Sequence, residues 1–305
     1  MRLYTHPACL AHDPGPGHPE SAARLRAVLA ALDDPRVAAV ERVEAPRATR
    51  EQLERVHDAD YVDDILASAP ASGYARLDPD TVMSAGSLEA ALRAAGAACA
   101  AVDDVLSGNT QRAFCAVRPP GHHATRNEAM GFCLFNNIAV AAAHALATSR
   151  VERIAIADFD VHHGNGTEAI FRHDPRVLYA SSHQMPLYPG TGTPTEHGDG
   201  NIFNAPLQPG AGSVAFRAAW EKRLLPELEL ARPQLVLISA GFDADARDPL
   251  ADLRLAPDDY AWITKRLIEL ADRDAEGHIV SMLEGGYDLD ALREDVAAHV
   301  AALMV

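Results

Sequence analysis

A repeated alternation of short apolar, β-rich runs with longer helical stretches constrains this chain more than any other feature. Strands are expected at residues 3–5, 113–117, 153–157, 177–181, 234–239 and 278–283. Helices are expected at residues 20–32, 86–106, 136–148, 213–230, 257–272 and 288–303, with a further start at the capping box of Thr49 and Gln52. Strands that are apolar throughout and alternate with helices predict a parallel sheet with helices on both faces.

The organisation of the chain favours one domain. It has 305 residues without an internal repeat or a low-complexity linker, so residues 1–305 are expected to form a single unit. Residues 183–212 form a long irregular stretch that contains five prolines. Proline reduces the entropy lost when a loop becomes ordered, and long loops in compact domains usually serve a function. We therefore expect an ordered, functional loop there.

Charge and hydropathy argue against several classes of protein. The formal net charge is −16 and there is no run of Lys or Arg, which argues against nucleic-acid binding through phosphates. The longest apolar run, residues 138–147, is interrupted by His144 and is too short to span a bilayer. Met1 leads directly into a strand-like segment rather than a signal peptide, so a cytoplasmic protein is expected. The four cysteines are widely spaced, which favours neither a disulfide framework nor a zinc ribbon.

Histidine, aspartate and tyrosine residues follow four of the predicted strands directly. In chain order they are His122, His123, Asp158, Asp160, His162, Asp243 and Tyr287. In an open parallel sheet, ligands bind outside the carboxyl ends of the strands. The motifs are therefore expected to meet at one edge of the sheet, although they are far apart in sequence.

Asp160, His162 and Asp243 form the candidate metal site. Residues two apart in an extended segment point to the same side, so Asp160 and His162 can act together. Three protein ligands with an open position are typical of a catalytic zinc site. Two carboxylates and one imidazole would also accept iron(II), cobalt(II) or manganese(II). A single Asp or His after a strand is more often a helix cap or a turn residue, and it is the combination that favours a metal.

The adjacent pair His122 and His123 is the candidate acid–base unit. Such a pair works only if neighbouring groups fix the ring tautomers, and Asp158 and Asn165 are available to do so. Tyr287 lies on a glycine-flanked turn and can direct its hydroxyl toward a developing oxyanion. These residue types together predict a metal-dependent hydrolase.

The sequence resembles the histone deacetylase superfamily along nearly its full length. The matching segments, in order, are residues 18–20, 24–25, 56–57, 61–62, 118–124, 131–137, 158–166, 188–192, 239–249 and 284–287. Asn137, Asn165 and the Glu284-Gly285-Gly286-Tyr287 turn are similar to the class II branch.

The resemblance implies a three-layer α/β fold of the arginase/deacetylase type, with a mostly parallel sheet of about eight strands. Two short edge strands are therefore expected beyond the six identified above. It implies one zinc ion per chain at the candidate triad. It further implies that His123 is the general base, that His122 assists the leaving amine, and that Tyr287 is the oxyanion donor. Asp158 would orient His122, and Asn165 would orient His123.

The resemblance also assigns residues around the site. The implied walls of a substrate tunnel are Gly131, Phe132, Tyr188 and Leu250, with Asp80 near the substrate backbone and Arg24 in an internal acetate-release cavity. A potassium ion is implied at Asp158, Asp160, His162, Ser181 and Ser182. A second potassium ion is implied near Phe171, Asp174 and Val177.

The function implied is zinc-dependent removal of acetyl or related acyl groups from lysine side chains of proteins or peptides. The alternative is an acetylpolyamine amidohydrolase, which acts on a small acetylated amine. Polyamine-selective relatives carry a glutamate where this chain has Leu250, so lysine is favoured. A third alternative is a non-catalytic acyl-lysine-binding protein, which the complete set of site residues disfavours. The sequence leaves the oligomeric state open, with a homo-oligomer among the alternatives.

Overall fold

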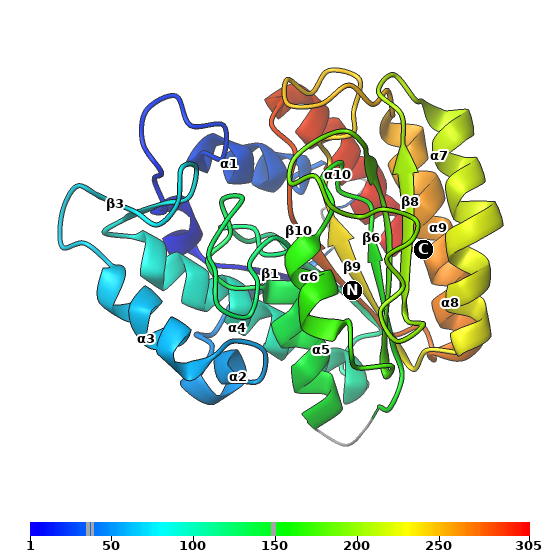
Figure 1. Ribbon diagram of the computed structural model, residues 1–305, viewed down its shortest axis with the longest axis horizontal. Helices are drawn as coiled ribbons and strands as arrows, with labels where there is room; N and C mark the ends of the chain where they lie inside the picture. The colour runs from blue at the N-terminus through cyan, green and yellow to red at the C-terminus, as the bar shows by residue number, and fades with distance from the viewer. Residues whose placement is uncertain (35–36, 38–39, 148–150) are drawn as a thin grey trace.

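The computed structural model describes residues 1–34, 37, 40–147 and 151–305 and contains one eight-stranded sheet (Figure 1). All its neighbouring strands run parallel. Across the sheet, the strands are β2 (Glu41–Glu44), β1 (Arg2–Thr5), β5 (Arg112–Cys115), β10 (Ile279–Leu283), β9 (Leu235–Ala240), β6 (Ile154–Asp158), β7 (Val177–Gln184) and β8 (Ile202–Leu207). A separate antiparallel pair is formed by β3 (Tyr74–Arg76) and β4 (Val82–Ser84).

Helices cover both faces of the sheet. On one face, α4 and α5 pack against the strands, with α2, α3 and α6 beside them; on the other lie α1 and α7 to α10 (Figure 1). Their bounds are α1 (Ala22–Ala31), α2 (Arg50–Glu54), α3 (Ala59–Ser68), α4 (Ser87–Leu106), α5 (Asn137–Ala147), α6 (Asn165–Phe171), α7 (Ser213–Ala219), α8 (Leu225–Ala231), α9 (Pro257–Asp274) and α10 (Leu289–Leu303). A short 3₁₀ helix spans Pro7–Leu10. The three-layer α/β prediction is confirmed.

The six predicted strands are all present, and the two edge strands that were expected beyond them are β2 and β8. The expectation of an irregular loop over residues 183–212 is wrong in one respect, because β8 lies inside it and β7 extends to Gln184. The side chain of Asn204 and the proline at 206 conceal the strand pattern of β8, which as an edge strand needs partners on one side only.

The helix predictions hold with one adjustment among the described residues. The stretch predicted at residues 213–230 is divided by a π-helical turn, Trp220–Leu224, where the Leu225 N–H reaches the Trp220 carbonyl. Pro226 lacks an N–H, so the carbonyl of Lys222 has no ordinary helical partner, which favours the wider turn. The capping box at Thr49 and Gln52 is confirmed. The predicted helix end at Thr148 lies outside the described residues.

The central strands explain why the site forms where it does. Every residue of β5, β6, β9 and β10 is buried, as expected for strands with helices on both sides. Because these strands are parallel, their carboxyl ends lie together, and each continues into one of the polar motifs. In the described part of the chain, no helix is long and apolar enough to cross a membrane.

Candidate active site

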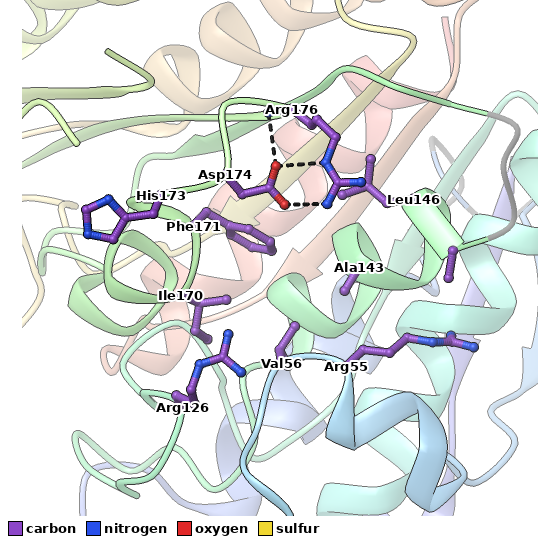
Figure 2. Close-up of a pocket in the computed structure, with 11 residues that line it drawn as sticks. Arg55, Val56, Arg126, Ala143, Leu146, Ile170, Phe171, His173, Asp174 and Arg176 are labelled. Carbon is purple, nitrogen blue, oxygen red and sulfur yellow. Dashed lines mark hydrogen bonds and ion pairs between the residues drawn. The ribbon is translucent and has the colours of Figure 1, made fainter. Parts of the chain in front are cut away.

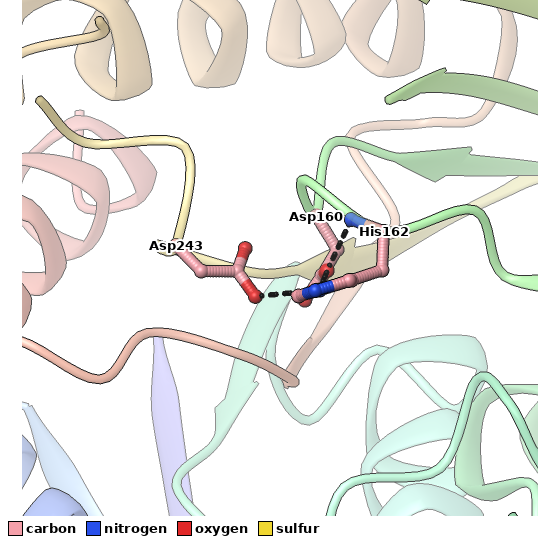
Figure 3. Close-up of side chains that lie close together, drawn as sticks. All are labelled: Asp160, His162 and Asp243. Atoms are coloured by element: carbon pink, nitrogen blue, oxygen red, sulfur yellow. Dashed lines mark hydrogen bonds and ion pairs between the residues drawn. The ribbon is translucent and has the colours of Figure 1, made fainter. Parts of the chain in front are cut away.

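Asp160, His162 and Asp243 come together at the ends of β6 and β9, and all three are buried (Figure 3). One potential ligand atom from each lies within 4.8 Å of the others. The His162 Nδ1 is 3.1 Å from Asp160 Oδ1 and 3.1 Å from Asp243 Oδ2. The three side chains that the sequence grouped therefore share one point in space.

Backbone groups hold the two carboxylates in place. Gly285 N–H donates to Asp160 Oδ2 at 2.8 Å, and Val161 N–H donates to Asp243 Oδ1 at 2.9 Å. The carboxylates also press against glycines, since a Cβ at Gly241 or Gly285 would lie 2.0 Å from a carboxylate oxygen. Any side chain at these two positions would displace the ligands, so the Gly residues of both motifs are a steric requirement of the site.

The electrostatics of this triad favour a cation. Burial raises the pKa of Asp243, and the nearby charge of Asp160 raises it further. Burial also opposes ionisation of Asp160, but His122 and His162 outweigh it and lower the pKa of that carboxyl. Two buried carboxylates this close repel each other unless positive charge lies between them. The donor set of two carboxylate oxygens and an imidazole nitrogen fits a divalent metal ion.

His122 and His123 lie side by side, with ring centroids 4.1 Å apart, but have different partners. His122 Nδ1 donates to Asp158 Oδ2 at 3.0 Å, whereas His123 Nδ1 donates to Asn165 Oδ1 at 2.8 Å. Burial disfavours the charged form of His122, but Asp158 and Asp160 outweigh it and raise its pKa to about 10. Burial lowers the pKa of His123 well below its usual value, and the charge of His122 lowers it further. One imidazole is thus disposed to be charged and the other neutral.

Tyr287 follows β10 on a turn that a buried arginine supports. Arg24 donates from Nε to the Gly286 carbonyl at 2.5 Å and from Nη2 to the Glu284 carbonyl at 2.5 Å. Its guanidinium lies 4.8 Å from the centroid of the Tyr287 ring. The Tyr287 N–H donates to Asp248 Oδ2 at 2.7 Å. Burial raises the pKa of Tyr287, with the Arg24 charge opposing it, so the phenol keeps its proton.

A narrow cavity of about 220 Å³ leads to these groups. It is lined by Asp80, His123, Gly131, Phe132, His162, Leu187, Tyr188, Leu250 and Tyr287. Apart from Asp80, the walls are mainly aromatic and aliphatic, while His123, His162 and the Tyr287 hydroxyl are the other polar groups of the lining. An extended aliphatic chain with a terminal polar group matches this distribution.

Comparison with known proteins agrees with this geometry. The family model described as histone deacetylase domain matches residues 18–303. The chain belongs to the histone deacetylase family. It is 37% identical to histone deacetylase 14, chloroplastic, of Arabidopsis thaliana, over 99% of this chain and 76% of that protein. It is 42% identical to a histone deacetylase-like amidohydrolase of Pseudomonas aeruginosa, over 89% of this chain and 73% of that one.

Structural comparison extends the match to the fold. The crystal structure of the HDA15 HD domain superposes with a TM-score of 0.94 at 35% identity, covering 99% of this chain and 87% of that one. The histone deacetylase fold is therefore present over essentially the whole chain.

The structure brings many of the site residues predicted from the sequence together at one edge of the sheet. The cavity is lined by all five residues that the resemblance assigned to a substrate tunnel, namely Gly131, Phe132, Tyr188, Leu250 and Asp80. Asp158 and Ser181 are partners in register on β6 and β7, with Ser182 next to them. The side chains of the two serines already have protein partners, because Ser181 Oγ meets His183 Nδ1 and Ser182 Oγ accepts from Trp220 Nε1. A potassium ion there would depend on the remaining oxygens.

Three residues with a part in the site were not singled out from the sequence. Glu284 accepts the N–H groups of Gly121 and His122 at 2.7 and 3.2 Å, and burial raises its pKa to about 7. Asp248 supports the backbone at Tyr287, and Leu187 completes the tunnel wall. A carboxylate at the end of an apolar strand was the available signal for Glu284. Leu187 gave none, because an apolar residue in a proline-rich loop is unremarkable.

Proposed function

We propose that this protein is a zinc-dependent hydrolase that removes acetyl or related acyl groups from lysine side chains. The observation that carries the proposal is the narrow apolar cavity ending at a buried Asp/His/Asp triad, a histidine pair and a tyrosine hydroxyl. The cavity suits the four methylenes of a lysine side chain, and its inner end suits an amide. Membership of the histone deacetylase family supports the same function.

Asp160, His162 and Asp243 would hold the zinc ion. When bound, it supplies Lewis-acid polarisation of the amide carbonyl and lowers the pKa of the attacking water. The hydrogen bonds from Gly285 and Val161 keep the two carboxylates oriented without consuming all of their lone pairs.

The two histidines have different roles in the proton transfers. His123 is neutral near pH 7 because of its low pKa, so its Nε2 can accept a proton from water. Its Nδ1 is fixed by Asn165, which leaves Nε2 as the free acceptor. As the C–N bond breaks, the proton that His123 took from water passes to the amine nitrogen, and the positive charge that His122 holds against Asp158 favours this transfer.

Tyr287 stabilises the negative charge that develops on the carbonyl oxygen. Its hydroxyl lies at the inner end of the cavity and stays protonated, so it can donate a hydrogen bond to an oxyanion. Arg24 and Asp248 hold the turn that carries it, from two different sides. These are positioning contacts, since the hydroxyl alone faces the substrate.

We further infer that lysine is preferred over polyamines and that one potassium ion binds around Asp158 and Ser181. Leu250 places an apolar side chain on the wall, whereas a free ammonium at the end of a polyamine would favour a carboxylate there. Asp80, on the connection between β3 and β4, can accept a hydrogen bond from a peptide backbone at the mouth. Asp158 is a buried carboxylate at the end of β6 and is in register with Ser181 of β7, so backbone and side-chain oxygens near it could bind a monovalent cation.

A substrate panel tests the proposal. Purified protein is assayed with acetyl-lysine peptides, longer acyl-lysine peptides and acetylputrescine, with and without a chelator. We expect the highest kcat/KM for an acyl-lysine peptide, and loss of all activities on chelation. A preference of tenfold or more for acetylputrescine would replace the lysine assignment by the polyamine one. Binding of acyl-lysine peptides without any turnover would favour the non-catalytic alternative.

A further inference from the structure

Three backbone carbonyls between α6 and β7 converge on one side-chain nitrogen. Asn201 Nδ2 lies 2.8 Å from the carbonyl oxygen of Phe171, 3.1 Å from that of Asp174 and 2.8 Å from that of Val177. These are the three residues at which the family resemblance implies a second potassium ion. Asn201 precedes β8, so the contact joins two segments of chain that are about 25 to 30 residues apart.

The orientation of the Asn201 amide is fixed by its surroundings. Its Oδ1 accepts from the Asp199 N–H at 3.1 Å, and its backbone carbonyl accepts from the Tyr179 N–H at 2.9 Å. The residue is only 2% exposed. Rotating the amide by half a turn would place Oδ1 against three carbonyl oxygens and Nδ2 against an N–H donor. Only the orientation with Nδ2 toward the carbonyls satisfies every partner.

The segment has no free negative charge to attract a cation. Asp174 is its only acidic residue, and both oxygens of that carboxylate face Arg176, with Nε at 2.8 Å and Nη2 at 2.7 Å (Figure 2). The pair lines a surface hollow of about 450 Å³ in which Arg55 and Arg126 also lie (Figure 2). The side chain of Asp174 is thus engaged by a neighbouring guanidinium, while its carbonyl accepts from Asn201.

We propose that the side-chain amide of Asn201 takes the place of the second potassium ion in this protein. An –NH₂ group offers two hydrogens, which three carbonyl oxygens can share through one three-centre bond. The nitrogen is already at hydrogen-bond distance from all three oxygens, so a potassium ion does not fit between them. The connection from α6 to β7 is therefore held without a metal. This inference is independent of the catalytic proposal.

The first experiment uses the unaltered protein. Backbone hydrogen exchange is measured in KCl and in tetramethylammonium chloride at equal ionic strength. We expect residues 174–179 to be protected equally in both salts, or to change less than residues 181–184, which lie beside the other implied potassium site. The proposal would be overturned if KCl slowed hydrogen exchange more at residues 174–179 than at residues 181–184.

The second experiment replaces the amide by a carboxylate of the same shape. Asn201→Asp puts an oxygen where three carbonyls need a donor, so we expect Tm in tetramethylammonium chloride to fall by roughly 5–10 °C. A cation can then bridge the four oxygens. KCl should therefore restore at least half of the lost Tm, once the change in Tm that KCl causes in the wild type is subtracted. Asn127→Asp, at an exposed asparagine, makes the same charge change as a control.

The two variants separate the outcomes. If KCl raises the Tm of Asn201→Asp but not that of Asn127→Asp, the proposal is supported, because removing the amide has then created a cation site. An equal response of both variants to KCl would contradict it. If Asn201→Asp does not fold in either salt, the exchange experiment on the unaltered protein decides.

Discussion

The inner end of the cavity and its outer wall are built in opposite ways. The inner end, made of Asp160, His162 and Asp243, lies after sheet strands and is buried. The outer wall, made of Phe132, Tyr188 and Leu250, lies on loops, and Tyr188 is 38% exposed. Backbone N–H groups hold the inner carboxylates, whereas the wall residues meet mainly other side chains.

The difference indicates where the chemistry and the selectivity reside. The inner end depends on the register of β6, β9 and β10, which cannot shift without disturbing the core. The wall depends on loop conformation, including a left-handed backbone at Phe132, where φ is 69°. Changes at the inner end should therefore abolish turnover, and changes at the wall should redistribute it among substrates.

The largest effect is expected from the metal ligands. Asp243→Asn removes one charge from the triad, so metal affinity should fall and kcat/KM should drop by about 10³-fold or more. Elemental analysis of the wild type should find one divalent ion per chain, and zinc or cobalt should restore activity after chelation. A fully active sample without a transition metal would contradict this assignment.

The next largest effect is expected at Tyr287, between the two regions. If its hydroxyl acts mainly on the transition state, Tyr287→Phe should lower kcat by about 10²- to 10³-fold with a much smaller change in KM. Tyr188→Phe, which removes a hydroxyl from the outer wall, is the control variant, and its kcat should fall far less. Steady-state kinetics of both variants measure the contrast, and an unaltered kcat for Tyr287→Phe would remove this residue from the mechanism.

A moderate effect is expected at Asn165, behind His123. Asn165→Asp places a charge 2.8 Å from the ring nitrogen and should raise the pKa of His123. Because His123 works as the neutral base, activity is lost as the pH falls through that pKa. The acidic limb of the kcat/KM profile should therefore move upward by about one pH unit. Asn165→Ser tests loss of the amide without added charge, and superimposable profiles for wild type and Asn165→Asp would refute the assignment.

The smallest effect is expected at the wall. Leu250→Glu should shift the ratio of kcat/KM toward acetylputrescine by about tenfold, because a carboxylate attracts the free ammonium. Leu250→Gln has a similar size without the charge and should shift it much less. Competition assays with an acetyl-lysine peptide give the ratio. A shift of equal size in both variants would mean that shape, not charge, sets the preference.

The sequence predicted the inner end better than the periphery, for a physical reason. Asp160 and His162 follow β6, which is apolar up to its last residue, Asp158, so both the strand and its polar end are visible in the sequence. The edge strands are not visible in this way. β2 reads Glu41-Arg42-Val43-Glu44 and is largely exposed, while β8 includes Asn204 and a proline. Their strand conformation is imposed by pairing with β1 and β7.

The supporting contacts were beyond sequence reasoning for a different reason. Asn201 donates to backbone carbonyls, which every residue has, so only the three-dimensional arrangement identifies this contact. Arg24 reaches the turn before Tyr287 across 260 and 262 positions of chain. The resemblance named Arg24 as part of an acetate cavity, and the structure adds its backbone contacts at Gly286 and Glu284.

The central position of β10 has a consequence for how the molecule is made. β10 joins β5 to β9, so the sheet halves β2-β1-β5 and β9-β6-β7-β8 are linked only through a strand near the end of the described chain. During synthesis, both halves can exist for a few seconds with the facing edges of β5 and β9 unpaired. Such apolar edges invite pairing with other chains until residues 279–283 emerge and insert. The yield of folded protein should therefore depend on how quickly translation proceeds from β9 to β10.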